Sequence, residues 1–324
     1  MRISSKVDSF VFAVVVIIVV AYFFPKLGQS ESNFPLETIS NVGISLIFFF
    51  YGLKLSPEKF KAGILNWKLH LLVQFSTFLL FPLIILAFYP LVRNENGQIL
   101  WIAFLFLAAL PSTVSSSVVM VSIARGNLPA AIFNASISGL IGIIVTPLWI
   151  DLFLTDTVNN SELANIYLKL IIKILVPVII GISLQKYLGK FATKNIRYLN
   201  LFDKSIILLI VYKSFAESFE DKVFKSLGIE YIIIVTSATI ALFFLVYILI
   251  GYFSCILKFN LKDKITAQFC GTKKSLMHGT VFSKILIPES VSLGIVLLPL
   301  MLFHAIQILI ISFIATRLAK RFER

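Results

Sequence analysis

The chain is a succession of long apolar runs separated by short segments that carry the charges. A transmembrane helix needs about 20 mostly apolar residues. Of all residues 58% are hydrophobic and only 14% charged, whereas soluble domains carry about 25% charged residues. The pattern predicts an all-α polytopic membrane protein. Its apolar runs are 9–24, 39–54, 68–90, 98–110, 128–151, 164–185, 204–216, 229–257 and 291–316.

The first apolar run has the features of either a signal peptide or a retained span. Arg2 and Lys6 precede it, as in a secretory signal. No small-x-small cleavage site follows, because the sequence continues as PKLGQSESNFP. We expect a retained transmembrane helix.

The distribution of basic residues decides whether 261–287 is a tenth span. When the loops are assigned alternately, starting inside, the inside set holds 19 basic residues and the outside set six. Without a crossing at 261–287, the basic tail from Arg317 to Arg324 would lie outside, against the positive-inside rule. We therefore predict ten spans with both termini cytoplasmic, and the acidic loop 151–162 outside.

The net charge of +13 raises the alternative of a nucleic-acid-binding protein. The basic residues lie in short loops between apolar segments, so we expect no nucleic-acid partner. Cys255 and Cys270 lie in or beside apolar segments and indicate no disulfide framework. The sequence lacks HExxH, paired carboxylates and a Cys/His set with metal spacing, so we expect no enzyme.

Ten spans divide into halves at 1–157 and 158–324, and an odd number of spans in each half makes any repeat inverted. The fourth span of each half is interrupted, at LPSTVSSSV (110–118) and at CGTKKSLMHG (270–279). Matched interruptions of this kind point to the binding site of a transporter.

Free backbone groups at a break in hydrocarbon need water, an ion or a substrate as partner. Hydroxyl groups are concentrated at the first break, where they could line such a site or bond back to their own helix and ease packing. They belong to Thr113, Ser115, Ser116 and Ser117.

Two adjacent lysines, Lys273 and Lys274, occupy the second break, between Thr272 and Ser275. Lys274 lies about 15 Å of helix from Lys264, near the bilayer midplane, too deep for easy snorkelling to the interface. With few acidic residues in the membrane interior, these lysines favour an anionic ligand.

Other polar residues within the spans have two interpretations each. His278 follows Lys274 by four residues and is either a proton-coupling group or a neutral hydrogen-bonding residue. Gln74 and Asn134 either line the site or bridge helices. Lys169 and Lys173 are expected to snorkel to the outer interface.

The stretch ALPSTVSSSVVMVSIARGN (109–127), followed by AAIFNASISGLIGIIVTPLW (130–149), resembles the bile acid:sodium symporter family. The segment YGLKLSPEKF (51–60) adds to a resemblance that spans most of the chain. It implies ten helices in two inverted five-helix repeats. Helices one, two, six and seven would form a panel domain. Helices three to five and eight to ten would form a core domain, with broken helices four and nine crossing.

The resemblance also implies a place for two sodium ions at that crossing. The matching positions are Ser115, Ser116, Ser117, Asn134, Ser136, Ser138 and, more loosely, Gln74. Na⁺ is the one cofactor considered, with Ser116, Ser117 and Asn134 as candidate ligands. In helix nine, Cys270 stands where the family has Glu, and Lys274 where it has Gln. We therefore expect the Lys274 ammonium to replace a sodium ion beside Ser115, Ser116 and Ser117.

These features predict a monomeric secondary transporter in a bacterial inner membrane. Its substrate would be an organic anion, either bile-acid-like or another amphipathic carboxylate or sulfate, moved by alternating access. The alternative is a membrane regulator or scaffold that keeps the fold without transporting. The expected partners are the small anion and the lipid bilayer.

Overall fold

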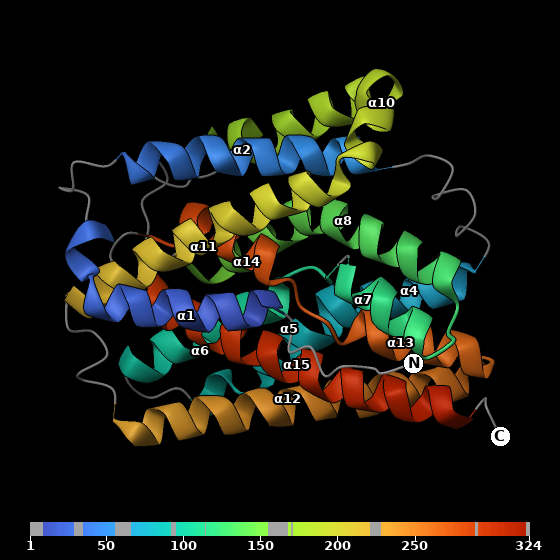
Figure 1. Cartoon of the computed structure of the whole chain (residues 1–324). Helices are drawn as coiled ribbons and strands as arrows, with labels where there is room; N and C mark the ends of the chain where they lie inside the picture. The colour runs from blue at the N-terminus through green and yellow to red at the C-terminus, as the bar shows by residue number, and fades with distance from the viewer. Residues whose placement is uncertain are drawn as a thin grey trace. The chain divides into compact units, whose positions relative to one another are not determined.

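All regular elements that the structure describes are helices, and no strand occurs among the described residues (Figure 1). The structure is a computed structural model. The prediction of an all-α chain is confirmed. The described residues are 9–28, 35–55, 66–91, 95–113, 115–154, 168–169, 171–220, 228–288 and 291–321.

Among the described residues, six helices are long and apolar enough to cross a membrane, and the chain is an integral multi-pass membrane protein. Two shorter apolar helices span Phe12–Phe23 and Gly97–Ala109. The total of ten spans stays a prediction. The six long helices are Leu36–Lys54, Trp67–Ala87, Leu128–Phe153, Ile171–Lys194, Glu230–Ile256 and Leu293–Lys320.

Two helices extend further than the apolar runs indicate. The run 164–185 predicts a helix that ends near residue 185, but the helix continues to Lys194, and residues 164–167 and 170 lie outside the described residues. The run 204–216 lies inside a helix from Ile196 to Glu220. Hydropathy marks the segment that suits lipid, whereas backbone hydrogen bonding continues into the polar residues beyond it.

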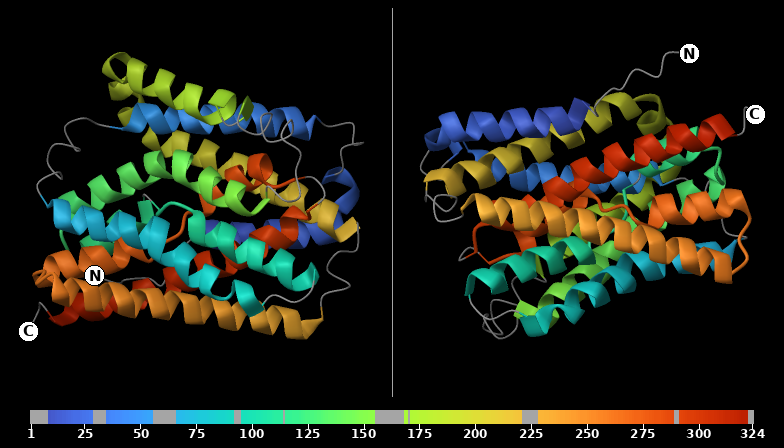
Figure 2. Two further views of the ribbon diagram at one scale, coloured as in Figure 1. Left: turned by 180° about the vertical axis from the view of Figure 1, so that it is seen from behind. Right: turned by 90° about the horizontal axis from the view of Figure 1, so that it is seen from below.

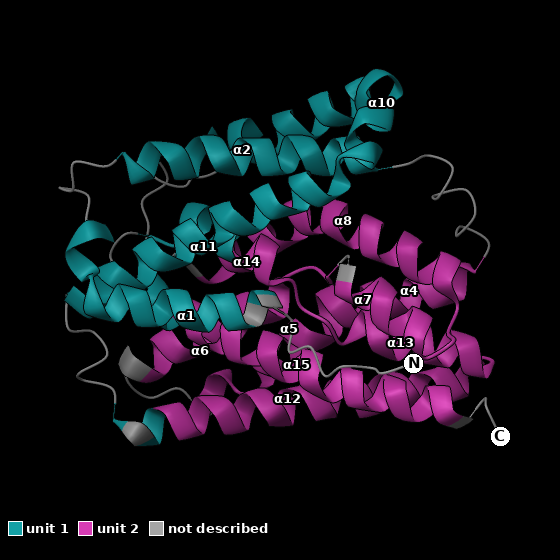
Figure 3. Ribbon diagram, in the orientation of Figure 1, with its two compact units in different colours: residues 1–55, 160–231, 280–295 teal, residues 56–159, 232–279, 296–324 magenta. Residues whose placement is uncertain are grey.

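The chain forms two compact units, and each draws on both halves of the sequence (Figure 3). Unit 1 contains residues 1–55, 160–231 and 280–295. Unit 2 contains residues 56–159, 232–279 and 296–324. The predicted repeats, 1–157 and 158–324, are a different division and stay a prediction.

The elements wholly within unit 1 are α1 (Ser9–Phe23), η1 (Pro25–Gly28), α2 (Leu36–Lys54), η4 (Ile171–Leu175), α10 (Val176–Lys194) and α11 (Ile196–Glu220). Those wholly within unit 2 are α4 (Trp67–Phe75), η2 (Ser76–Leu80), α5 (Phe81–Ala87), η3 (Tyr89–Leu91), α6 (Glu95–Ala109), α7 (Ser115–Ile123), α8 (Leu128–Leu154) and α13 (Leu261–Gly271). Three helices include residues of both units: α12 (Ile229–Ile256), α14 (Leu276–Leu286) and α15 (Leu293–Arg321).

In unit 1, α2 and α10 lie side by side (Figures 1 and 2) and approach each other through glycines. A Cβ atom added at Gly52 would lie 2.5 Å from the carbonyl oxygen of Val178, and one at Gly181 would collide with the carbonyl oxygen of Phe49. Lipid gives no hydrophobic drive for helix association, so close backbone approach at small residues supplies the dispersion contacts instead.

The helix α2 also packs against α11 in unit 1, and ion pairs join the two helices near both ends of α2. At one end, the Lys54 ammonium lies 2.6 Å from the carboxylate of Asp203, which is 2% exposed. Lys54 also donates to Asn200 Oδ1 at 3.2 Å. At the other end Glu37 pairs with Lys213. The pairing of each end fixes the antiparallel register of the two helices.

In unit 2, α8 packs against α4, α6, α7 and α13. One of its anchors is Trp149, whose indole N–H donates to the carbonyl oxygen of Phe78 at 2.8 Å. That carbonyl lacks its usual α-helical donor, because the residue four positions later is Pro82, which has no N–H. Trp149 of α8 therefore donates to a carbonyl that has no helical partner because of Pro82.

Both interruptions predicted within unit 2 are present. Helix α6 ends at Ala109 and α7 begins at Ser115, while α13 ends at Gly271 and α14 begins at Leu276. Of the residues between α6 and α7, Val114 lies outside the described residues.

The glycine contact of α2 and α10 predicts a position-specific effect of one methyl group. Gly181→Ala should lower the free energy of unfolding by about 1–3 kcal/mol, because the Cβ forces the two backbones apart. Thermal unfolding of the purified protein measures it. Gly189→Ala, in the same helix, is the matched control, since a Cβ there meets only the flexible side chain of Gln185. Equal melting temperatures for the two variants would contradict the packing account.

Candidate functional site

The two helix interruptions of unit 2 lie against each other and are joined by hydrogen bonds to the backbone. The Ser275 N–H donates to the Pro111 carbonyl oxygen at 2.9 Å. The Ser112 hydroxyl donates to the Cys270 carbonyl oxygen at 2.6 Å. The Ser112 N–H in turn donates to the Ser138 hydroxyl of α8 at 2.9 Å. Each broken end thus supplies partners for the free backbone groups of the other.

Local sequence explains why the second interruption ends one helix and starts the next. The Thr272 hydroxyl donates back to the Gln268 carbonyl at 2.6 Å. The helix α13 does not continue, because the Lys274 N–H donates to Gln307 Oε1 and the Ser275 N–H to the Pro111 carbonyl oxygen. Ser275 caps α14: its hydroxyl accepts from the His278 N–H at 3.3 Å and bonds His278 Nδ1 at 2.9 Å. This capping arrangement is typical of a helix start. It leaves Lys273 and Lys274 in the irregular segment between the two helices.

Lys274 is fully buried, and its ammonium group donates to three backbone carbonyl oxygens. These belong to Ala108 at 2.5 Å, Thr77 at 2.6 Å and Leu110 at 2.9 Å. An ammonium has three donors and no acceptor, so the three carbonyls match its full bonding capacity. The arrangement is a cation site whose cation is tethered to the chain.

One of these carbonyls, that of Thr77, is free because of a π-helical turn followed by proline. In η2, the Phe81 N–H donates to the Ser76 carbonyl, five residues earlier. The backbone donor at the same spacing for Thr77 would be Pro82, which has no N–H. π-Turns occur frequently at functional sites, and here the turn exposes an acceptor that Lys274 uses.

The other two carbonyls belong to the end of α6. The last carbonyls of a helix have no intrahelical donor and carry the negative end of the helix dipole. The carbonyl between them, that of Ala109, is satisfied by the Thr146 hydroxyl at 2.8 Å. Lys274 therefore acts as a C-terminal cap for α6.

Further contacts fix the position of Lys274. Its ammonium lies 4.2 Å from the centroid of the Phe81 ring, a cation–π contact. The Gln307 amide brackets its backbone: Oε1 accepts from the Lys274 N–H and Nε2 donates to the Lys274 carbonyl, both at 2.9 Å. Gln307 Nε2 also lies 2.8 Å from His304 Nδ1. In the part of the chain that the structure describes, Lys274 is paired with carbonyl oxygens and a ring rather than with a carboxylate.

The structure corrects the expected division of roles between the two lysines. The sequence predicts the Lys274 ammonium beside Ser115, Ser116 and Ser117. Instead, the Lys273 ammonium donates to the Ser116 carbonyl oxygen at 2.8 Å, and Lys274 points to Thr77 and α6. Lys273 and Lys274 are adjacent in an irregular segment, and their side chains point in different directions. The alignment of Lys274 with a sodium ligand of the family therefore did not predict which groups it contacts. The Ser115 side chain lies outside the described part of the chain.

The hydroxyl groups at the start of α7 form their own cluster. Thr113 Oγ1 lies 2.7 Å from Ser116 Oγ and 2.9 Å from Ser117 Oγ. Thr113 and Ser117 are buried. Some of these hydroxyls therefore bond one another, a third arrangement beside the two that the sequence suggested.

Asn134 belongs to a different network. Gln74 donates to Asn134 Oδ1 at 3.1 Å, and Asn134 Nδ2 bonds His70 Nδ1 at 2.9 Å. Within the described ranges, Asn134 bonds neither Ser116 nor Ser117. The predicted sodium ligands are thus divided between two networks.

Gln74 Oε1 is a buried atom without a hydrogen-bond partner among the described residues. Ser136 is half-buried in α8, next to the buried Ala135. Of the three predicted site residues in α8, Asn134 and Ser138 are buried and Ser136 is half-buried.

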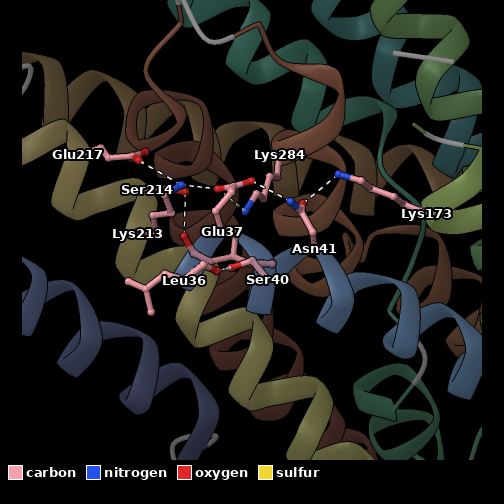
Figure 4. Close-up of polar contacts among 10 residues, drawn as sticks. Leu36, Glu37, Ser40, Asn41, Lys173, Lys213, Ser214, Glu217 and Lys284 are labelled. Carbon is pink, nitrogen blue, oxygen red and sulfur yellow. Dashed lines mark hydrogen bonds and ion pairs between the residues drawn. The ribbon is translucent and has the colours of Figure 1, made fainter. Parts of the chain in front are cut away.

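Unit 1 holds a polar cluster that the sequence analysis missed (Figure 4). We call it the Glu37 cluster. Its members share a network of hydrogen bonds and ion pairs centred on Glu37. They are Glu37, Asn41, Lys173, Lys213, Glu217 and Lys284.

Glu37 lies in the first turn of α2, where the helix dipole favours an acidic side chain. Its Oε2 accepts from Lys213 and, at 3.1 Å, from Lys284, while Asn41 donates to its Oε1 at 3.1 Å. Lys173, expected to snorkel, donates to Asn41 Oδ1 at 2.9 Å within the unit. An available sequence signal was Glu37 itself, an acid two residues before an apolar run in a chain with few acids.

The carbonyl contacts of Lys274 predict a large effect on stability. Lys274→Met keeps the length of the side chain but removes its three donors. Because buried carbonyls would be left unpaired, the free energy of unfolding should fall by on the order of 3 kcal/mol. Thermal unfolding measures the change. The control is Lys262→Met, an exposed lysine in the first turn of α13, with an expected change below about 0.5 kcal/mol. An equally small change for Lys274→Met would contradict the capping role.

Comparisons with known proteins agree with a transporter fold. The model of the SBF-like CPA transporter family matches residues 8–320. A Pseudomonas aeruginosa protein named "Uncharacterized protein PA2026" is 37% identical over 97% of this chain and 93% of its own length. The Escherichia coli "Putative symporter YfeH" is 33% identical over 100% of this chain and 96% of its own.

A rat relative, sodium/bile acid cotransporter 7, is 29% identical over 96% of this chain and 92% of its own. The resemblance to the bile acid:sodium symporter family, drawn from the residues around Pro111, is confirmed. The chain belongs to the SBF-like CPA transporter family.

Proposed function

We propose that the chain is a secondary transporter of a small organic anion. The observation that carries this proposal is the fixed cation at the junction of two broken helices in unit 2. A buried ammonium that bonds carbonyl oxygens rather than a carboxylate gives the site positive character, which favours an anionic ligand. The names of the relatives, a symporter and a sodium/bile acid cotransporter, support the same class of function.

The candidate contacts for the anion are Lys273 and the groups at the start of α7 and α14. Helix N-termini attract anions through their free N–H groups and the helix dipole. Lys273 is fully buried and reaches the first turn of α7 at Ser116. We propose that Lys273 contacts the anion, while Lys274 holds the first half of the fourth helix in place. Thr272, Ser275 and His278 would fix the second break around them.

We propose an alternating-access mechanism in which unit 1 is the panel and unit 2 the core. The resemblance assigns the first, second, sixth and seventh helices to the panel. Support comes from the residue ranges 1–55 and 160–231, which fall in unit 1. The ten-helix inverted repeat, the cytoplasmic termini and the bacterial inner membrane belong to the same proposal.

The residues at the crossing do not fit the sodium site that the family resemblance implies. Three carbonyl oxygens, two at the end of α6 and one in η2, already receive the Lys274 ammonium. Asn134 Oδ1 receives Gln74, and Cys270 supplies no carboxylate. We therefore propose an anion transporter whose coupling does not use sodium at this crossing.

The proposed topology predicts which residues a membrane-impermeant thiol reagent reaches in intact cells. With Cys255 replaced by Ser, a cysteine introduced at Thr157 should be labelled from outside. One at Lys320 should be labelled only after the cells are made permeable, because the basic tail stays in the cytoplasm. Labelling of the Lys320 position in intact cells would contradict the ten-span topology.

The built-in cation predicts little dependence of ligand binding on sodium. Bile salts, aromatic carboxylates and sulfate esters should be screened by ligand-induced thermal stabilisation in Na⁺ and in choline buffer. An anion that stabilises the wild type should do so about equally in both buffers, and its effect should be lost in Lys274→Ala.

Two results would count against the proposal. A strong Na⁺ requirement that Lys274→Ala leaves unchanged would show that the lysine is no cation substitute. Absence of both binding and uptake by reconstituted protein across the panel would favour a regulator or scaffold with this fold.

A further inference from the structure

The Glu37 cluster of unit 1 binds a carboxylate in the structure, and that carboxylate belongs to the chain. Three donors converge on Glu37: the ammonium groups of Lys213 and Lys284 and the amide of Asn41 (Figure 4). They come from α11, α14 and α2 respectively. Helices that are distant in sequence therefore build one carboxylate-binding arrangement.

The two lysine donors are much less exposed than the acceptor. Lys213 and Lys284 are each 11% exposed, whereas Glu37 is 51% exposed. A half-exposed carboxylate contributes little through its ion pairs and finds water as soon as it rotates outward. The lysine side chains are only 11% exposed and reach water less easily. Release of Glu37 would thus cost little for the glutamate and leave two largely covered ammonium groups in need of an anion.

Charge in the cluster also favours an additional anion. It contains three lysines, Lys173, Lys213 and Lys284, but only two carboxylates, Glu37 and Glu217. Glu217 pairs with Lys213 at 3.5 Å and is the weaker partner of that lysine. Lys173 donates to the neutral amide oxygen of Asn41. The three positive charges of the cluster therefore exceed its carboxylates by one.

The position of Lys173 is a separate indication of function. It lies in the π-helical turn η4, Ile171–Leu175. A π-turn inserts one extra residue into a helix and changes the direction in which the side chains point, and such turns are frequent at functional sites. Here the π-turn contains Lys173, which donates to Asn41, and Asn41 in turn donates to Glu37.

We infer that the Glu37 cluster is a second anion-binding site, specific for small organic carboxylates, in which Glu37 is an internal occupant that the ligand displaces. The ligand carboxylate takes the places of the two Glu37 oxygens and receives Lys213, Lys284 and Asn41. Lys173 supplies the additional positive charge. The inference concerns unit 1 alone and does not require that the chain transports its ligand.

Removal of the internal occupant should expose the site. In equilibrium binding of radiolabelled benzoate to the purified full-length protein, Glu37→Gln should raise the affinity about tenfold or more over the wild type. The reason is that benzoate no longer competes with a tethered carboxylate for two charge-assisted hydrogen bonds. Glu37→Asp keeps the charge on a shorter side chain that reaches the lysines less well, so it should give a smaller increase.

Two variants test whether benzoate binds at the Glu37 cluster itself. Glu230→Gln removes one negative charge from the first turn of another helix, α12, at an exposed position, and should leave benzoate affinity unchanged. The double variant Glu37→Gln/Lys284→Gln should lose the gain, because one of the two ammonium donors is gone.

The inference is overturned if neither Glu37→Gln nor Glu37→Asp binds benzoate more tightly than the wild type. It is also overturned if Glu230→Gln gives the same gain, or if the gain survives in the double variant, since benzoate would then bind elsewhere. If Glu37→Gln fails to fold, Glu37→Asp decides alone. A failure of uptake in proteoliposomes would contradict the proposed transport function but would leave this binding result intact.

Discussion

The arrangement of unit 2 depends on how backbone groups are satisfied where a helix stops inside hydrocarbon. Without water, each unpaired carbonyl or N–H costs several kcal/mol. At the two interruptions, Ser112 and Ser275 satisfy part of this requirement by bonding the opposite interruption, and Thr272 by a local bond. The carbonyls of Thr77, Ala108 and Leu110 need donors from elsewhere, and the three hydrogens of the Lys274 ammonium supply them. A buried lysine is energetically unfavourable in a membrane. Lys274 is tolerated because, without it, three carbonyl oxygens would stay unpaired, which is also unfavourable.

The surroundings of Lys274 and of the lysines in the Glu37 cluster stabilise positive charge in different ways. Lys274 is fully buried and bonded to backbone dipoles, so its surroundings are fixed by the fold. Lys213 and Lys284 pair with a carboxylate that is half exposed. Fixed dipoles suit a permanent structural cation, whereas a carboxylate open to water suits the exchange with a ligand that we propose.

Much of the fold could be predicted from sequence because the bilayer imposes strict rules. Apolar runs located the helices, and the Pro111 and Gly271 segments located both interruptions. Hydropathy could not locate the helix end at Lys194, because helical hydrogen bonds continue into polar residues beyond the apolar segment. The π-turn at Ser76–Leu80 could not be predicted either. It arises because the Phe81 N–H donates to the Ser76 carbonyl rather than to that of Thr77, and the sequence does not show which carbonyl is used.

The two helix interruptions were predicted, but the contacts of the residues at them were not. The sequence brought Lys273 and Lys274 to the breaks, but which lysine faces α6 depends on the irregular backbone between α13 and α14. Asn134 was grouped with Ser116 and Ser117 by resemblance, whereas packing pairs it with Gln74 and His70. The Glu37 cluster depends on contacts between residues as distant as Glu37 and Lys284, which a single sequence does not reveal.

The central proposal is that the Lys274 ammonium is a permanent cation at the helix interruptions, so that no coupling sodium ion binds there. Equilibrium binding of radiolabelled sodium to the purified wild-type protein tests it most directly, because it needs no knowledge of the substrate. The account predicts no saturable sodium binding in the millimolar range. Saturable binding that Lys274→Met leaves unchanged would contradict it, since a sodium site would then exist beside the lysine.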